Sequence, residues 1–423
     1  MISPIAFKTF LDVLILSLIP LLVSIMGGVG FDFAVGNRMV SLHSLKNVLI
    51  ATILFWIIKK IIYKESSFIK TSLNLPVLIY LITFLIAVVF SSQPKVSFLY
   101  FRDFILYTSM VFLLINNIDN KNKLEAILFI FLISVIYTSA RGTIQHVNSR
   151  LGYDDGNYYS FGGRAEFGAA AVLTIPVLAG FLLNYRKNLT FSIFFVSGLI
   201  ILITGMVVSY SRGSWIGFIA VILFFILMYV HILKNWRFFV LTFLTLVFLF
   251  LIIPSSLKQR MISIADFKNT TGDRISAWKS SLAMIKDFPF LGIGPGTYDV
   301  IAQQYKGNDA KEDWTRGWHA HNIFLHVTSE NGLIGLFSFL LIIFISFKKY
   351  FELQEKINDI HLKNLLNGTM ASLGGYLVCS QTTVFFANHN KNEKISMFLW
   401  FDIALIFIIE NIAKKQDEKG RAV

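Results

Sequence analysis

The sequence contains a single cysteine, Cys379, so no disulfide bond can form within the chain. Cys379 lies inside a long apolar run, and we expect it to be a small core residue. The first apolar run has no Ala-x-Ala-like cleavage site behind it, so we expect it to be a membrane anchor and not a removed signal peptide. The apolar runs also lack an alternation of period two, which favours helices over a β-barrel.

Apolar side chains are present in large excess. Of the 423 residues, 55% are hydrophobic and 42 are phenylalanine, and the mean hydropathy is +0.65. These values are far above those of soluble domains. Runs of about 20 apolar residues are long enough to cross a hydrocarbon layer of about 30 Å as helices. The sequence therefore predicts an all-α polytopic membrane protein with about twelve transmembrane helices, at residues 10–26, 45–63, 73–90, 99–115, 124–138, 166–184, 189–208, 215–233, 238–254, 320–347, 365–386 and 395–412.

The formal net charge of +13 could indicate nucleic-acid binding. The basic residues lie in the loops between the spans, however, so we expect membrane lipids and no nucleic acid as partners. Twelve spans place both termini on one side, and the short loops of that side carry more Lys and Arg, which predicts cytoplasmic termini. The expected division is residues 1–254 with spans one to nine, an extracytoplasmic (periplasmic) loop domain at 255–319 that contains an amphipathic helix, residues 320–412 with spans ten to twelve, and a cytoplasmic tail at 413–423.

Polar residues gather where the tenth span begins. His319, His321 and Asn322 stand at its outer end, and Glu330 lies two to three turns further in. Polar groups cost free energy in hydrocarbon, so they often mark a pathway or a site. His321 is the candidate proton acceptor, because imidazole titrates near neutral pH and the Asn322 amide could orient it. His319 is a neighbour without an assigned role, and Glu330 is interpreted as a hydrogen-bonded structural acid, with a second base as the alternative.

Two arginines are expected on the same outer face. Arg212 lies in the tight turn between spans seven and eight, where an arginine costs up to about 3 kcal/mol unless it pairs or reaches the lipid phosphates, which is the alternative to a ligand contact. Arg274 lies in the long loop, where Asp273 is expected to cap a helix that begins at Arg274. Apolar residues then recur at spacings of three and four, which predicts an amphipathic helix on the membrane or on the spans below it: Ile275, Trp278, Leu282 and Ile285.

Three loop segments carry weaker signals. Arg164 belongs to the outer segment 141–166, whose aromatics, glycines and arginines could hold anions or stack on sugars, or could form a plain surface loop. The glycines at 292–296 predict a compact turn, because the Lys-Ser/Thr pair of a Walker-type phosphate loop is absent. Residues 306–318 are polar and contain two tryptophans, which is typical of a mobile lid with rings for sugar stacking.

Arg212, Arg274 and His321 together suggest transfer from a lipid-diphosphate donor. Arginine offers a planar fork to phosphate oxygens, and a histidine can take the proton of an acceptor hydroxyl. Fixed cations stabilise the charge that pyrophosphate gains as its bond breaks. No Asp-x-Asp motif faces outside, and the two histidines have no ligand cluster beside them, so neither a metal nor a cofactor is expected.

Four motifs follow one another from the turn after span seven into span ten. They are Ser211-Arg212-Gly213-Ser214-Trp215, Gly272-Asp273-Arg274 with Trp278, the segment Asp287 to Gly296, and His321-Asn322 followed after nine residues by Gly332-Leu333-Ile334-Gly335. In this order they resemble the bacterial O-antigen ligase and O-antigen polymerase superfamily. The last motif is similar to the ligase pattern of His, then Asn, Ser or Gln, nine residues, and Gly-x-x-Gly.

The resemblance implies an inverting, metal-independent glycosyltransferase of the bacterial inner membrane with a periplasmic active site. It would move polysaccharide from undecaprenyl pyrophosphate to a sugar hydroxyl of lipid A-core in lipopolysaccharide biosynthesis. In this scheme His321 would be the base, and Arg212 and Arg274 would bind the pyrophosphate. Arg164 stands where relatives often have an Arg followed by Gly, an aromatic residue and Asn-Pro-Asn, but this chain lacks the Asn-Pro-Asn.

Three alternatives are compatible with parts of the pattern. An O-antigen polymerase would use the same donor with a second lipid-linked glycan as the acceptor, and a protein O-glycosyltransferase would use a protein hydroxyl. A transporter or lipid flippase belongs to a different class, and would place ionisable residues through the bilayer midplane together with repeated broken helices. The charges here gather at the outer ends of the spans, which favours an enzyme.

Overall fold

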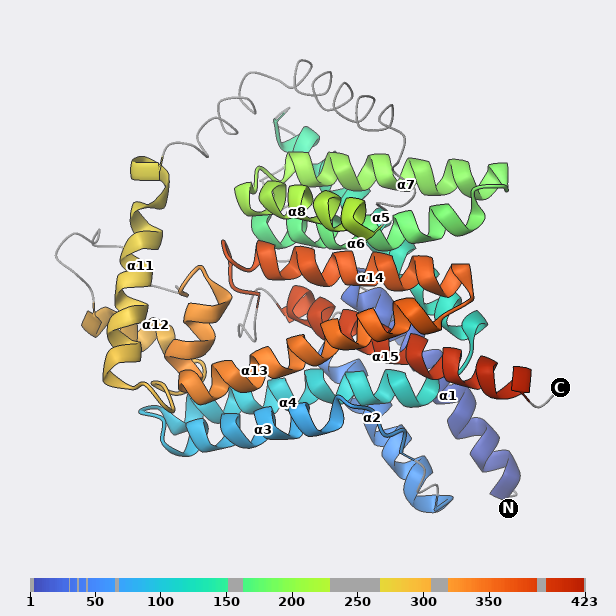
Figure 1. Ribbon diagram of the computed structural model, residues 1–423, viewed down its shortest axis with the longest axis horizontal. Helices are drawn as coiled ribbons and strands as arrows, with labels where there is room; N and C mark the ends of the chain where they lie inside the picture. Colours follow the sequence, from blue (N-terminus) through green and yellow to red (C-terminus); the bar gives the residue numbers. More distant parts are fainter. Residues whose placement is uncertain are drawn as a thin grey trace.

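The computed structural model describes residues 4–29, 31–35, 38–42, 45–64, 68–150, 163–228, 267–305, 319–385 and 393–421. These residues form a bundle of helices, which confirms the predicted all-α class (Figure 1). The elements are α1 (Pro4–Met26), β1 (Phe31–Val35), β2 (Arg38–Leu42), α2 (Leu45–Ile62), α3 (Asn74–Val89), α4 (Pro94–Asn117), α5 (Lys121–Arg150), α6 (Arg164–Tyr185), α7 (Leu189–Val208), α8 (Arg212–Met228), α11 (Phe267–Asp287), α12 (Tyr298–Ile301), the 3-10 helix η1 (Ala302–Tyr305), α13 (Ile323–Lys356), α14 (Ile360–Cys379) and α15 (Glu393–Arg421).

The apolar runs of the sequence correspond to helices wherever the structure describes them. Within the described ranges, seven helices are long and apolar enough to cross a membrane, and α3 and α8 are shorter apolar helices. The chain is therefore a multi-pass membrane protein. The predicted ninth span, at 238–254, lies outside the described residues.

A two-stranded antiparallel hairpin follows α1, with Phe31 opposite Leu42 and Val35 opposite Arg38. The sequence analysis did not predict it. The helical prediction rested on apolar runs of about 20 residues, and two strands of five residues each are far below that length.

Close helix contacts in the centre of the bundle depend on small residues. A Cβ atom on Gly180 of α6 would lie 2.7 Å from the carbonyl oxygen of Asn364 in α14, and one on Gly368 of α14 would lie 2.5 Å from the carbonyl oxygen of Pro176 in α6. Small residues at such positions let two helix backbones approach in the membrane, where packing replaces the hydrophobic effect as the driving force. The α6–α14 pair is thus a closely packed contact in the bundle, and α7, α8 and α15 also pack against it.

Both chain termini lie at one end of the bundle, on the right in Figure 1, whereas α11, α12 and the beginning of α13 lie at the opposite end. Some helices extend beyond their predicted spans. The α5 helix continues to Arg150, so the first ten residues of the predicted outer segment 141–166 are helical and not a loop. The hydrogen-bond ladder of a helix does not stop where the apolar run stops, which explains the difference.

The predicted beginning of α11 was wrong. The helix begins at Phe267, seven residues before Arg274, so Asp273 lies inside it and is not its N-cap. The face of α11 that is turned to the protein includes Ala277, Ser280, Ser281 and Met284, whereas Ile275 and Leu282 are 36% and 57% exposed. Small residues make up most of this face, because α11 lies close against α12 and α13.

The tenth span is broken and not continuous. Gly332 has φ 68° and ψ −175°, a conformation essentially restricted to glycine, and it divides α13 into two helical pieces. The backbone N–H of Leu333 donates to the carbonyl of Pro289 at 2.8 Å, which replaces the helical hydrogen bond lost at the break. The turn after α11 is therefore hydrogen-bonded to α13 at its break.

Candidate functional site

The Arg212 turn is held by serines. Ser211 Oγ accepts the N–H of Ser214 at 3.3 Å, which is the arrangement of a helix N-cap, and Ser209 Oγ accepts the N–H of Ser211 at 3.1 Å. Tyr210 adopts φ 53°, which reverses the chain between α7 and α8. These contacts place Arg212 at the first turn of α8.

The start of α8 rests directly on the end of α14. A Cβ atom on Gly213 would lie 1.8 Å from Thr382 Oγ1, and one on Gly217 would lie 2.1 Å from Cys379 Sγ. Cys379 is 1% exposed, which confirms its prediction as a small core residue. Because the two glycines permit this approach, Arg212 lies immediately beside the segment that follows α14.

That same segment holds His321. The Nδ1 atom of His321 lies 3.1 Å from the carbonyl oxygen of Thr382, and the N–H of Ile323 donates to the carbonyl of Ser380 at 2.9 Å. A carbonyl oxygen only accepts hydrogen bonds, so Nδ1 carries the proton of the neutral imidazole and Nε2 carries the lone pair. His321 has φ 50°, in the left-handed region that non-glycine residues adopt rarely. The backbone is thus bent locally so that the imidazole meets Thr382.

The Asn322 side chain has a different partner from the predicted one, which was the His321 imidazole. Its side-chain oxygen accepts the N–H of Leu325 at 3.0 Å and caps the N-terminus of α13. The group that orients the His321 imidazole is the Thr382 carbonyl. The sequence analysis missed Thr382, because a backbone carbonyl carries no side-chain signal and lies in a distant part of the chain.

His319 lies against His321, with ring centroids 4.5 Å apart. Neither ring nitrogen of His319 has a hydrogen-bond partner among the residues that the structure describes. Burial lowers the pKa of His319 well below its ordinary value, and the charges of His321, His326 and Arg274 lower it further. His319 is accordingly neutral at neutral pH.

The charges of Arg212 and Arg274 interact although the two residues lie 62 positions apart in the sequence. Burial lowers the pKa of Arg274, and the neighbouring positive charge of Arg212 lowers it further. Arg274 has no carboxylate within ion-pair distance among the described residues. Like charges repel each other and a bound anion would relieve this repulsion, so this corner of the protein is suited to bind an anion.

Glu330 is held by the turn at residues 292–296, called the glycine turn below, and by α12. Its carboxylate Oε1 accepts the N–H of Tyr298 at 3.2 Å, and the backbone N–H groups of Gly296 and Thr297 also bind the carboxylate. Gly292, Gly294 and Gly296 all have positive φ, which confirms the compact turn predicted at 292–296. In this arrangement Glu330 connects the turn to α13 as a hydrogen-bonded acid.

A third histidine, His326, was missed by the sequence analysis. Its Nε2 lies 3.5 Å from Glu330 Oε2, and its ring centroid lies 5.3 Å from that of Tyr298. His326 and Glu330 lie four residues apart on one helix, and this spacing could have indicated their contact from the sequence. Across the described part of the chain, no group of three or more His, Cys, Asp and Glu side chains has the arrangement of a metal site.

Arg164 lies near the Arg212 turn but does not interact with the other candidate residues in the described part of the chain. It begins α6, whose first turn lies against the Arg212 turn, because a Cβ atom on Gly168 would lie 2.4 Å from Ser214 Oγ. The Arg164 side chain is exposed, and within the described ranges no interaction links it to Arg212, Arg274 or His321. The predicted lid, 306–318, lies outside the described residues.

Residues 197–340 match a family model described as O-antigen ligase. The matched segment begins in α7, ends in α13 and contains Arg212, Arg274, His319, His321, Asn322 and Glu330. No curated protein sequence matches the chain. The match confirms the resemblance to the O-antigen ligase and O-antigen polymerase superfamily, whose members are membrane enzymes of the glycosyltransferase type.

Proposed function

We propose that the chain is an O-antigen ligase that moves polysaccharide from undecaprenyl pyrophosphate to a sugar hydroxyl of lipid A-core. The observation that carries this proposal is the position of the Arg212–Arg274 pair at the end of the bundle that also holds His321, an imidazole of defined tautomer. A pair of guanidinium groups suits a diphosphate, and a fixed imidazole suits an acceptor hydroxyl.

The reaction requires one proton transfer and one displacement. Nε2 of His321 takes the proton of the acceptor hydroxyl while the hydroxyl oxygen attacks the anomeric carbon of the donor sugar. The bond between that carbon and the pyrophosphate oxygen breaks, and undecaprenyl pyrophosphate leaves with the electron pair. Attack from the face opposite to the leaving group inverts the anomeric configuration.

Arg212 and Arg274 support the leaving group. The negative charge on the pyrophosphate grows as the bond breaks, so fixed cations bind the transition state more strongly than the bound donor. The mutual repulsion of the two guanidinium groups is relieved when the diphosphate lies between them. Arg164, exposed at the start of α6, is available to bind the donor at the edge of the same site.

His319, Asn322 and Glu330 have supporting roles in this scheme. Asn322 caps α13 and Glu330 binds the glycine turn, so both fix the backbone that carries His321. Neutral His319 packs against the catalytic ring and adds no further positive charge beside it. The proposed location is the bacterial inner membrane with cytoplasmic termini and a periplasmic site. The opposite ends that the termini and α11 occupy in Figure 1 support this orientation.

An O-antigen polymerase is the closest alternative, because its donor chemistry is identical. The His-Asn pair followed after nine residues by Gly-x-x-Gly favours the ligase. The test gives the purified protein a lipid-linked glycan together with lipid A-core. The ligase forms glycosylated core, whereas products that contain only longer lipid-linked glycan would contradict the ligase and support the polymerase.

A further inference from the structure

A pocket of about 370 Å³ lies between α5, α6 and α7, at the end of the bundle where both termini lie. Five aromatic rings and one carboxylate line it. The rings are Phe129, Phe181, Tyr185, Phe191 and Phe195, and the carboxylate is Glu125. None of these residues belongs to the proposed active site, which is at the opposite end of the bundle.

The aromatic rings form a connected wall. The Tyr185 ring lies 5.2 Å from Phe191 and 6.1 Å from Phe195, and the Phe181 ring lies 5.7 Å from Phe195, as centroid distances. Phe181 and Phe195 are almost fully buried, whereas Phe191 is 40% exposed and stands at the open side. Aromatic faces attract cations, most strongly where water is excluded.

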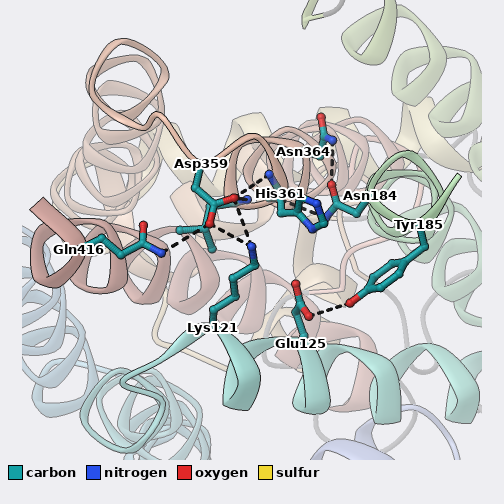
Figure 2. A network of polar contacts seen from close by, with 9 residues as sticks. Lys121, Glu125, Asn184, Tyr185, Asp359, His361, Asn364 and Gln416 are labelled. Carbon is teal, nitrogen blue, oxygen red and sulfur yellow. Dashed lines mark hydrogen bonds and ion pairs between the residues drawn. The ribbon is translucent and has the colours of Figure 1, made fainter. Parts of the chain in front are cut away.

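Glu125 provides the negative charge of the pocket. Its Oε2 accepts the hydroxyl of Tyr185 at 2.8 Å (Figure 2), while its Oε1 is buried and has no hydrogen-bond partner in the part of the chain that the structure describes. The nearby ammonium of Lys121 is bound to Asp359 at 2.9 Å and so is already paired. A buried carboxylate oxygen without a donor is unfavourable, and a bound cation with an N–H group would satisfy it.

This chemistry selects a primary ammonium group. A quaternary ammonium would contact the rings but has no N–H to donate to Glu125 Oε1. An anionic group would be repelled by the carboxylate. The ligand class is therefore an R–NH3+ group on a carrier that reaches the pocket through its open side at Phe191.

The surroundings indicate that the carrier is a phospholipid. The α7 helix lines the pocket with its first turns and is the least buried of the candidate membrane spans in the described part of the chain. Its outer face carries an apolar stripe at helical spacing that acyl chains can cover. Arg186 and Lys187 follow Tyr185 directly, are exposed, and have no acidic partner among the described residues, so they can meet a lipid phosphate. The stripe consists of Leu189, Ile193, Val196 and Ile200.

We propose that this pocket binds the headgroup of an ethanolamine phospholipid, with the ammonium between Glu125 and the aromatic rings and the phosphate beside Arg186 and Lys187. The bound lipid ties α5, α6 and α7 together at the end opposite to the proposed active site. The proposal concerns lipid binding alone and stands independently of the transferase chemistry.

Native mass spectrometry of the full-length protein in detergent tests it. Phosphatidylethanolamine, phosphatidylcholine and phosphatidylglycerol with identical acyl chains are titrated in parallel. We expect the ethanolamine lipid to bind about tenfold more tightly than the other two, as one charged hydrogen bond to a buried group would give. Equal binding of the three lipids would overturn the proposal. Free phosphoethanolamine is added as a soluble competitor, and if it alone occupies the pocket and the lipid does not displace it, the lipid assignment is wrong.

Glu125→Gln should abolish the preference for the ethanolamine lipid, because the amide keeps the shape of the side chain and loses its charge. Glu355→Gln removes an acid at a site away from this pocket, on the last turn of α13, and should leave the preference unchanged. Phe191→Ala is a second variant at an exposed position that keeps Glu125 and opens the aromatic wall, so it should weaken ethanolamine-lipid binding several-fold. A preference that survives in both Glu125→Gln and Phe191→Ala refutes the assignment.

Discussion

The carbonyl oxygen of Thr382 lies 3.1 Å from Nδ1 of His321, across 61 positions of the sequence. This contact defines the tautomer of the imidazole and directs its basic nitrogen, Nε2, away from Thr382. The left-handed backbone of His321 is part of the same arrangement, since a non-glycine residue with φ 50° needs surrounding contacts to hold it. The proposed base is therefore oriented before any substrate binds.

Replacing His321 with alanine tests the proposed base. We expect the transfer rate to fall by about 100- to 10,000-fold, the usual contribution of a general base, while the donor binds as before. Rates are measured with saturating lipid-linked glycan and lipid A-core. His361→Ala, in the first turn of α14 at the opposite end of the bundle (Figure 1), is the matched control and should retain normal transfer. A folded His321→Ala protein with full activity would exclude the base role.

Arg274→Ala should separate donor binding from stability. Loss of this guanidinium removes charged hydrogen bonds to the donor worth about 1.5–3 kcal/mol, so affinity should fall by at least about tenfold. It also removes the repulsion from Arg212 that lowers the pKa of Arg274, so the thermal unfolding temperature should stay the same or rise. Both are measured in the same preparation, the affinity by competition with undecaprenyl pyrophosphate.

Lys279→Ala is the control for that experiment, because Lys279 is exposed on the same helix. It should change neither donor affinity nor unfolding temperature. Unchanged affinity in Arg274→Ala would remove this arginine from the donor site.

His319 should make the protein less stable in acid. Its pKa is lowered in the folded state from the ordinary 6.5, so below pH 6.5 the unfolded chain binds a proton that the folded protein does not. Stability from this residue is full above pH 6.5 and falls as the pH decreases below that value. The loss of stability should be measurable between pH 6.5 and 5.0.

The measurement compares unfolding of the unmodified protein and of His319→Gln at pH 7.5 and 5.0. The variant has no titrating group at this position, so its free energy of unfolding should differ less between the two pH values. An identical pH dependence in both proteins would show that His319 is already protonated or solvated in the folded state.

Gly332→Ala should strongly destabilise the protein. An alanine would adopt an unfavourable φ of 68°, and its Cβ would lie 2.0 Å from the carbonyl oxygen of Phe290. The conformational strain alone costs about 1–3 kcal/mol. Gly205→Ala is the control, because its nearest contact is 3.3 Å and its helical backbone is ordinary, so it should change the free energy of unfolding much less. Chemical denaturation in detergent measures both.

The membrane helices were predictable because each depends on a local property. A run of about 20 apolar residues in hydrocarbon must satisfy its backbone hydrogen bonds internally, and a helix does so irrespective of its neighbours. The boundaries were less predictable. The α5 helix continues to Arg150 and α13 to Lys356, since the hydrogen-bond ladder extends into polar sequence once a helix has formed.

The candidate site was predictable as a set of residue types and not as a geometry. Arg212, Arg274 and His321 stood out because charged and polar groups are rare in so apolar a chain. Thr382 contributes only a backbone carbonyl, which any residue could supply, so no pattern indicated it. The break at Gly332 also escaped prediction, because the surrounding run is apolar on both sides and a glycine inside a helix does not by itself indicate a kink.

By itself, the sequence determined that this protein is a helical, multi-pass membrane protein with a few ionisable groups at the ends of its helices. The reason is that the composition and length of an apolar run determine whether that segment is more stable in hydrocarbon than in water. Tertiary structure alone decided which of those groups meet. The contact of α8 with α14 at Gly217 and Cys379 and the position of α11 beside α13 bring distant residues together. These arrangements depend on steric fit between segments far apart in the chain, which no local pattern of residues encodes.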